Sequence, residues 1–348
     1  MNPLRLDIGL PMHVFLYEWA TGGGLTHQQG SLPTSILREG AAIVSAVAAD
    51  LVKTNHCRVT ALRDLRVLDL CLPGCELIDL HSPTAHREEI ERLAAKADGT
   101  VVIAPEFDQI LERTAESVTA AGGRLLSPPS NFIRVAADKQ QTARRLAESK
   151  IPVPTAIQLE PDEKLPTDFV YPAVLKPIDG AGSQDIQLVA SPHDTPLPYA
   201  WARRLERYYP GLAASVAFLC GPHEVVPLPP CRQILSADGR LAYTGGELPL
   251  PTGLAERATG LGRRVLDSMP AAHGYIGIDL LLGRDPTGSD DIVVEVNPRL
   301  TTSYVGLQAA CQSNLAEAML AVCAGREVAL EFSERTIAFD VEGNTSFV

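Results

Sequence analysis

Two segments near the carboxyl end of the chain carry oxygen-bearing side chains inside runs that otherwise look buried. Asp279 lies in the apolar run 275–280, and Glu295 and Asn297 lie in the run 292–297. Side chains alternate along a strand, so Glu295 and Asn297 would share one face, and a hairpin would bring Asp279 beside them. Two carboxylates and an amide oxygen form the kind of hard site that suits Mg²⁺ carrying phosphates.

The alternative is an ordinary hairpin whose polar side chains point to water. Ile278, Val294 and Val296 argue against it, because they make both strands look buried and bare carboxylates are costly in such places. No His or Cys lies among the three oxygen-bearing residues, which disfavours zinc. The pattern therefore favours a magnesium site.

A second candidate site is a lysine at the end of an expected strand, followed by a glycine-rich turn. Lys176 ends the strand, and the turn contains Gly180, Gly182 and Ser183. A lysine placed there can meet phosphate oxygens, and glycines let backbone N–H groups approach the same phosphates. The order of residues in a P-loop is absent, and the alternative for Lys176 alone is a solvated lysine.

Three further segments carry weaker signals. Lys139 lies in an expected helix, where most lysines are simply exposed. Residues 206–211 form a short linker whose backbone could pair with an adenine edge, or a plain helix-to-strand connection. Glu18 and the glycines Gly22 and Gly23 follow the first expected strand, where open α/β sheets bind ligands, so Glu18 could pair with an ammonium group. The alternative for the glycines is a flexible turn, since their spacing does not give GxGxxG.

The elements that must position these side chains alternate between strand and helix, which implies a parallel α/β sheet in the first third of the chain. The expected strands there cover residues 13–17, 59–62, 100–104 and 124–126, and the expected helices cover residues 35–53 and 88–97. Further along, we expect helices over residues 131–149, 199–208, 252–269 and 313–323, and strands over residues 173–176, 186–189, 214–219, 241–244, 276–282 and 292–296.

The composition limits the classes of partner. The 348 residues are too many for one ordinary core, and 45% of them are hydrophobic, so we expect a globular protein of two or three domains. A net charge of −12 disfavours nucleic acid and anionic membranes, and no run is long and apolar enough to span a bilayer. The seven cysteines show no zinc spacing and favour reduced thiols in a cytoplasmic protein.

Taken in their order along the chain, these segments resemble the ATP-grasp superfamily. The resemblance implies an α/β fold with α+β lobes, in which a Rossmann-like pre-ATP-grasp domain (residues 12–129) precedes a small lobe (130–213) and a large lobe with the metal site (214–348). It implies Mg²⁺ ligands at Asp279, Glu295 and Asn297. The implied nucleotide-binding residues are Lys139, Lys176, Gly180, Gly182, Ser183, Glu206, Tyr208 and Tyr209.

Two positions depart from the family pattern. Ala213 stands where many members hold the ribose with a glutamate, and Gly277 stands where D-alanine–D-alanine ligases have an arginine. The charge that neutralises an acyl phosphate must then come from elsewhere. Arg299 is the first candidate, because it follows Asn297 on the same face if the strand continues, and Arg232 is the second.

Within the superfamily, residues 17–24, Arg232-Gln233 and residues 243–249 are most similar to the tyramine–glutamate ligase group of methanofuran-type cofactor synthesis. The implied activity is ATP-dependent joining of an amino-acid carboxylate, such as L-glutamate, to a tyramine-like amine through an acyl phosphate. ATP and Mg²⁺ (with Mn²⁺ as a substitute) are the implied cofactors, the substrates are small molecules, and a homodimer is one option. The alternatives are a non-catalytic ATP-binding regulatory protein and an ATP-grasp kinase of small molecules.

Overall fold

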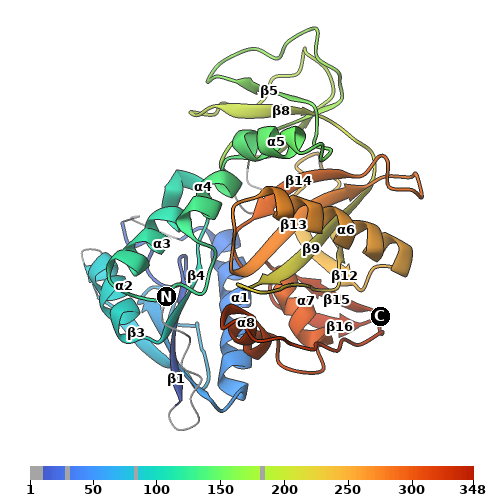
Figure 1. Ribbon diagram of the computed structural model, residues 1–348. Coiled ribbons are helices and arrows are strands. Elements are labelled where there is room, and N and C mark those ends of the chain that lie inside the picture. The colour runs from blue at the N-terminus through green and yellow to red at the C-terminus, as the bar shows by residue number, and fades with distance from the viewer. Residues whose placement is uncertain (1–10, 28–31, 82–84, 181–184) are drawn as a thin grey trace.

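The computed structural model describes residues 11–27, 32–81, 85–180 and 185–348, and its strands form three sheets. Figure 1 shows an amino-terminal α/β unit on one side, a large sheet with its helices on the other, and a small lobe above them. Each of these three parts supplies side chains to the candidate site described below.

The amino-terminal sheet is parallel and has the strand order β3-β2-β1-β4. Its strands are β1 (Met12–Glu18), β2 (Cys57–Asp64), β3 (Glu76–Leu80) and β4 (Gly99–Ile103), and its helices are α1 (Thr34–Lys53), α2 (Ala85–Lys96), the short 3₁₀ helix η1 (Phe107–Gln109) and α3 (Ile110–Ala120). The expected parallel α/β sheet is thus confirmed. The strand expected over residues 124–126 supplies only an isolated bridge from Leu125 to Thr100.

The order of this sheet creates a crevice beside β1. The chain leaves β1 toward β2 on one side, and β4 lies on the other side, so the strand order reverses between β1 and β4. Ligands of open α/β sheets bind outside the carboxyl ends of the strands at such a switch point. Glu18 ends β1 and Glu106 follows β4, so both carboxylates belong to this crevice edge.

The small lobe contains a four-stranded antiparallel sheet and two helices. Its elements are α4 (Ser130–Ala137), α5 (Lys139–Glu148), β5 (Ala156–Leu159), β6 (Ala173–Pro177), β7 (Gln187–Val189) and β8 (Arg203–Arg207), in the strand order β5-β8-β6-β7. The single helix expected over residues 131–149 is broken at Asp138. That residue has an extended backbone and accepts a hydrogen bond from the Gln141 N–H, which caps α5.

The helix expected over residues 199–208 is wrong, because residues 203–207 form β8 at the centre of this sheet. Leu205 is fully buried in the core of the lobe, while Arg204 and Glu206 point to the opposite face. This alternation has the period of a strand. Arg204 and Glu206 therefore lie on one face of a strand, which their position in a run of polar residues did not indicate.

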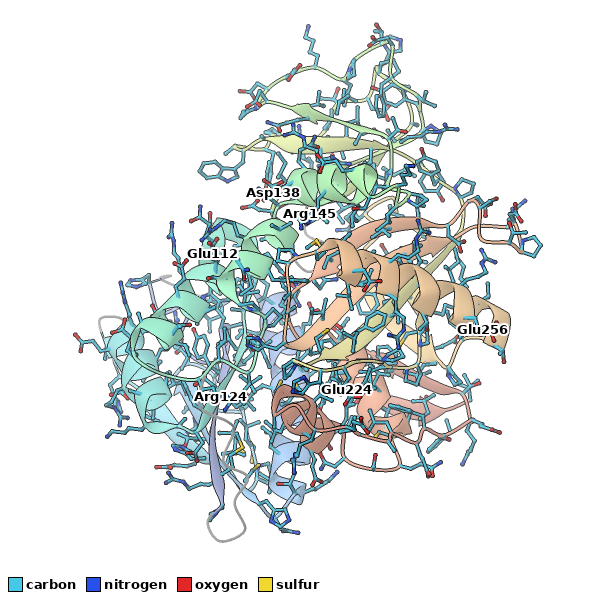
Figure 2. All side chains as sticks on the ribbon, in the orientation of Figure 1. Glu112, Arg124, Asp138, Arg145, Glu224 and Glu256 are labelled. Atoms are coloured by element: carbon cyan, nitrogen blue, oxygen red, sulfur yellow. The ribbon has the colours of Figure 1, made fainter. Side chains whose placement is uncertain are left out.

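The large sheet follows the small lobe and has the strand order β14-β13-β9-β11-β12-β15-β16, with β10 paired to β9. Its strands are β9 (Leu212–Cys220), β10 (Val225–Pro227), β11 (Cys231–Leu235), β12 (Tyr243–Leu248), β13 (Gly274–Leu282), β14 (Ile292–Asn297), β15 (Ile337–Asp340) and β16 (Thr345–Phe347), and its helices are α6 (Thr252–Ser268), α7 (Ser303–Ala310) and α8 (Leu315–Cys323). Helix α6 packs on β9 and β13 through an apolar stripe that includes Leu261 and Val265. In Figure 2, Asp138 and Arg145 mark α5 above this body, where Arg145 donates to the carbonyl of Ser268 at the end of α6.

Helix α1 joins the amino-terminal sheet to the large lobe. It runs through the centre of Figure 1 and packs against α7 and α8, so that one apolar core includes Val14 and Leu51 as well as Leu219 and Leu315. Among the described residues, no helix combines the length and the apolar character that a membrane span requires. All seven cysteines lie in the described part and are free.

A buried polar network fastens α1 to α7. The Asp50 carboxylate accepts hydrogen bonds from the Tyr304 hydroxyl (3.0 Å) and from the Gln308 amide (2.8 Å). Asp50→Ala should lower the free energy of unfolding by about 1–3 kcal/mol, because the buried Tyr304 hydroxyl loses its acceptor and the half-buried Gln308 amide keeps only the Ala46 carbonyl. Urea denaturation measures this change. Asp69→Ala, at an exposed position, is the control and should stay within about 0.5 kcal/mol of the wild type; equal losses in both variants would contradict a stabilising network.

Candidate active site

A cavity of about 260 Å³ lies where the three parts of the chain meet. The small lobe contributes Lys176 and Glu206, the large sheet contributes Asp279 and Glu295, and α1 contributes Glu39. The cavity therefore contains both lysine and carboxylate groups, which is an arrangement suited to a charged ligand rather than to an apolar one.

The three predicted metal ligands come together as the hairpin pattern predicts. Asp279 on β13 pairs with Glu295 on β14, and Asn297 pairs with Gly277, so all three side chains share one face. The Asn297 amide donates to Asp279 Oδ2 (3.1 Å), which leaves the amide oxygen of Asn297 free. Gln233 on β11 donates to the other Asp279 oxygen (2.9 Å).

The two carboxylates affect each other's ionisation. Burial and the charge of Glu295 raise the pKa of Asp279 to about 7. Burial alone would also raise the pKa of Glu295, but the charges of Lys139 and Lys176 outweigh it and lower that pKa. Two carboxylates paired across strands repel each other, so a cation between them is favourable.

The donor set tests whether a metal would fit. It offers two carboxylates and one amide oxygen, which are the ligand types that Mg²⁺ prefers. No group of three or more His, Cys, Asp or Glu side chains suited to a metal exists in the described part of the chain. The residues present therefore fit a magnesium ion that completes its shell with other oxygens, and do not fit a closed zinc site.

Lys139 is aimed at this carboxylate pair by the break between α4 and α5. Its ammonium group lies 2.8 Å from Glu295 Oε1 and donates to the carbonyl of Gly180 (2.6 Å). Its backbone N–H donates to the carbonyl of Ile178 (3.1 Å). Lys139 thus links the metal-type carboxylate to the start of the glycine-rich turn. Gly182 and Ser183 lie outside the described residues.

Lys176 forms a second ion pair on the small-lobe side of the cavity. Its ammonium group lies 3.0 Å from Glu206 Oε2, and the Arg204 guanidinium binds the other oxygen of Glu206 (2.6 Å). The side chains of Lys176 and Glu206 are only 4% and 6% exposed, so neither is the solvated residue of the alternative interpretation. Strands β6 and β8 place Lys176 directly opposite Arg204, which explains why Glu206 bridges both cations.

The linker from β8 to β9 borders the same cavity. Tyr208 donates its backbone N–H to the carbonyl of Pro172 (3.0 Å), and the Tyr209 hydroxyl contacts the Thr155 hydroxyl (3.2 Å). Both tyrosines line the cavity, and so does Ala213, the position without a ribose-binding glutamate. The structure therefore brings the linker and Lys176 to the lining of one cavity.

The two arginine candidates have different surroundings. Arg299 lines the cavity, is buried, and donates from Nε to Glu106 Oε1 (2.9 Å) and from Nη1 to the carbonyl of Leu300 (3.3 Å). Burial would lower the pKa of Arg299, but the charges of Glu106, Glu39 and Glu295 together outweigh it and raise that pKa. Arg232 points away from the cavity, where its side chain is 54% exposed and pairs with Glu247.

The amino-terminal candidates serve the turn after β1. Glu18 accepts hydrogen bonds from the backbone N–H groups of Ala20 (3.0 Å) and Thr21 (2.7 Å) and from the Thr21 hydroxyl (2.6 Å). Gly22 donates to the carbonyl of Glu18, and Gly23 has a φ of 98°, which glycine adopts without strain. Glu18 lines a smaller cavity of about 70 Å³, whereas the two glycines line neither cavity.

The sequence analysis missed several cavity residues. Glu39, Tyr243 and Thr302 line the cavity, and Glu106 holds Arg299 from the amino-terminal domain. Glu39 and Glu106 lie far from the other site residues along the chain, so no local motif marks them. Gln233 had a signal, because it follows Arg232 in a segment already noted, but only the strand register shows that it faces Asp279.

Comparisons with known proteins agree with this arrangement. A family model described as an ATP-grasp domain matches residues 136–303, and one described as a pre ATP-grasp 3 domain matches residues 57–133. The chain is 25% identical over 230 residues to a tyramine–L-glutamate ligase from Methanocaldococcus fervens, covering 65% of this chain and 66% of that relative, just under two thirds of its length. It is 19% identical to the ligase of the same name from Methanocaldococcus jannaschii, covering 85% and 84%.

A solved structure shows the same fold. The L-amino acid ligase from Bacillus licheniformis superposes with a TM-score of 0.69 at 14% identity, covering 95% of this chain and 80% of that one. At this identity the likeness concerns the fold alone. Together with the two domain matches it confirms the fold that the resemblance implied: the chain has an ATP-grasp fold, in which a match to a pre-ATP-grasp domain precedes a match to an ATP-grasp domain.

Proposed function

We propose that this protein is an ADP-forming ligase that joins an amino-acid carboxylate to an amine. The observation that carries the proposal is the convergence of Lys176, Asp279, Glu295 and Asn297 around one cavity, with Lys139 paired to Glu295. Such a set can hold a triphosphate and neutralise charge as it develops during phosphoryl transfer. A protein that only bound nucleotide would not need an additional buried arginine beside the metal-type residues.

Two chemical steps follow from this arrangement. In the first, the substrate carboxylate attacks the γ-phosphorus of ATP, which forms an acyl phosphate and releases ADP. In the second, the amine attacks the acyl carbon, loses a proton, and displaces inorganic phosphate. Lys139 and Lys176 would bind phosphate oxygens in the first step, and Arg299 would neutralise the acyl phosphate.

Asp279, Glu295 and Asn297 would hold Mg²⁺, or Mn²⁺ in its place, and the ion would screen the phosphate charges when bound. In the structure Lys139 lies on Glu295 and Lys176 lies on Glu206. Each lysine therefore already neutralises a buried carboxylate before any phosphate arrives. Binding of the nucleotide would exchange these contacts between lysine and carboxylate for contacts between lysine and phosphate.

The names of the curated relatives suggest the substrates. Both are tyramine–L-glutamate ligases, so we propose L-glutamate as the carboxylate donor and tyramine or a similar aromatic amine as the acceptor. The division into residues 12–129, 130–213 and 214–348 stays a prediction, as does a homodimer. Incubation with Mg-ATP, L-glutamate and tyramine, followed by mass spectrometry, tests the proposal through the amide product. A stable phosphorylated product would instead indicate a kinase.

The first prediction from the proposed function concerns the nucleotide product. An acyl-phosphate route should release ADP and inorganic phosphate in equal amounts, because the carboxylate attacks the γ-phosphorus. Chromatography of the spent nucleotide measures this directly. AMP and pyrophosphate as the main products would show adenylation of the carboxylate and would contradict the proposed route.

The second prediction concerns Lys176. Lys176→Ala should weaken ATP binding about ten- to a hundredfold, because a charge-assisted contact of this kind is worth about 1.5–3 kcal/mol. Isothermal titration with ATP measures the change. Lys164→Ala, at an exposed position in the same lobe, is the matched control and should bind ATP like the wild type. Equal affinities in a folded Lys176→Ala variant would remove Lys176 from the site.

The third prediction concerns the metal ligands. Glu295→Gln should abolish ADP release at ordinary Mg²⁺ concentration, because it removes one carboxylate ligand and the charged partner of Lys139. Asn297→Asp should be milder, since it keeps an oxygen ligand. Glu256→Gln on the exposed side of α6, labelled in Figure 2, is the control, and circular dichroism checks the fold. Near wild-type turnover in Glu295→Gln would refute the metal assignment.

A further inference from the structure

We infer that Glu39 is the residue that selects an amino acid as the carboxylate substrate, by receiving the ammonium group of that amino acid. The inference rests on the proposed function and names a specificity-determining residue for it. Glu39 lies on α1, in the amino-terminal domain, and the sequence motifs do not include it.

The position of Glu39 is the first argument. Glu39 and Arg299 both line the large cavity and also the smaller cavity at the switch point between β1 and β4. The two cavities therefore meet at these two side chains. Lys176 and the linker residues Tyr208 and Tyr209, which the proposed function assigns to the nucleotide, line the large cavity and not the smaller one. A substrate that extends from the metal-type residues toward the amino-terminal domain would pass between Glu39 and Arg299.

The charge of Glu39 is the second argument. Its Oε1 accepts a hydrogen bond from the Thr302 hydroxyl (2.7 Å), and in the described part of the chain no lysine, arginine or histidine forms a salt bridge with it. By contrast, Glu106, Glu206 and Glu295 each pair with a cation. Arg299 is near enough for its charge to act on Glu39, although the two residues form no salt bridge. A half-buried carboxylate without a salt bridge is costly in a cavity, so a cationic group of the ligand would be favourable there.

The opposite charge at the junction is the third argument. Arg299 uses Nε on Glu106 and Nη1 on the carbonyl of Leu300, and no described residue accepts a hydrogen bond from its Nη2. The junction thus offers an available guanidinium nitrogen and an available carboxylate. This pair complements a ligand that carries both a carboxylate and an ammonium group, whereas a simple dicarboxylic acid would leave Glu39 unpaired beside a second anion.

Glu18 is the other carboxylate that lines the smaller cavity, and it is less suited to receive an ammonium group. Three donors of its own turn occupy its two oxygens, and a side chain on Gly40 would collide with it at 2.6 Å. Glu18 is therefore already satisfied within its turn. Thr302 lies in the segment between β14 and α7. Its hydroxyl donates to Glu39 from the large lobe, so Thr302 acts as a positioning residue for Glu39.

The test compares L-glutamate with glutarate, which has the same two carboxylates but no ammonium group. In ADP-release assays with tyramine and Mg-ATP, Glu39→Gln should lower kcat/KM for L-glutamate at least about tenfold, since a charge-assisted hydrogen bond is lost. It should not lower kcat/KM for glutarate, because it removes a negative charge beside that anion, and it should leave the KM for ATP unchanged. Glu39→Asp keeps the charge and should recover part of the preference for L-glutamate.

Glu342→Gln is the matched control, because Glu342 pairs with the neighbouring Arg38 and lies outside both cavities that Glu39 lines. Calorimetric titration of the same ligands, with a non-hydrolysable ATP analogue present, reads binding without turnover. If another amino acid replaces L-glutamate, the proposed substrate is wrong and the comparison is made with that amino acid and its deaminated acid. Equal loss for both acids in Glu39→Gln, or no loss for either, overturns the role of Glu39, as does a wild type that binds no amino acid.

Discussion

The rest of the site depends on the need to neutralise carboxylates that are held close together and away from water. Asp279 and Glu295 face each other across two strands whose other residues form a core. Their mutual repulsion and burial raise the pKa of Asp279 to about 7, so the pair is stable only with cations nearby. The small lobe supplies these cations, because Lys139 reaches Glu295 and Lys176 lies close enough to lower its pKa. The same charges thus dock the lobe and, in the proposed function, would bind phosphates.

Charge is distributed unevenly along the cavity, and this distribution has a structural cause. The small-lobe wall carries Lys176, which is backed by Glu206 and Arg204, while the α1 end carries Glu39 without a salt bridge to a described residue. Arg299 lies at the α1 end and donates a hydrogen bond to Glu106, which fixes its position. Each buried charge therefore has a fixed orientation before a ligand binds, which reduces the cost of reorganisation during reaction.

Helix α1 connects this charge arrangement to the fold. Its carboxyl-terminal half is buried between the parallel sheet and α7, where Asp50 is fastened by Tyr304 and Gln308. Glu39, nearer its amino-terminal end, receives the Thr302 hydroxyl from the segment just before α7. The helix that shares a core with both domains therefore also places the carboxylate at the junction of the two cavities. A shift between the domains would alter the α1 end of the cavity and the core together.

The sequence by itself determined the features that depend on neighbouring residues, which are the periodicity of each segment and the chemistry of its side chains. Apolar alternation around Asp279, Glu295 and Asn297 predicted a buried hairpin with an oxygen site, and the strand–helix alternation predicted the parallel sheet. The helix expected over residues 199–208 failed because charged residues at Arg204 and Glu206 hide a two-residue period that only sheet pairing reveals. Glu39, Glu106 and Gln233 could not be found from spacing, since their partners lie 263, 193 and 46 residues away along the chain. Only tertiary packing decides such contacts, because burial sets which charges must be paired and the domain arrangement sets which partners are in reach.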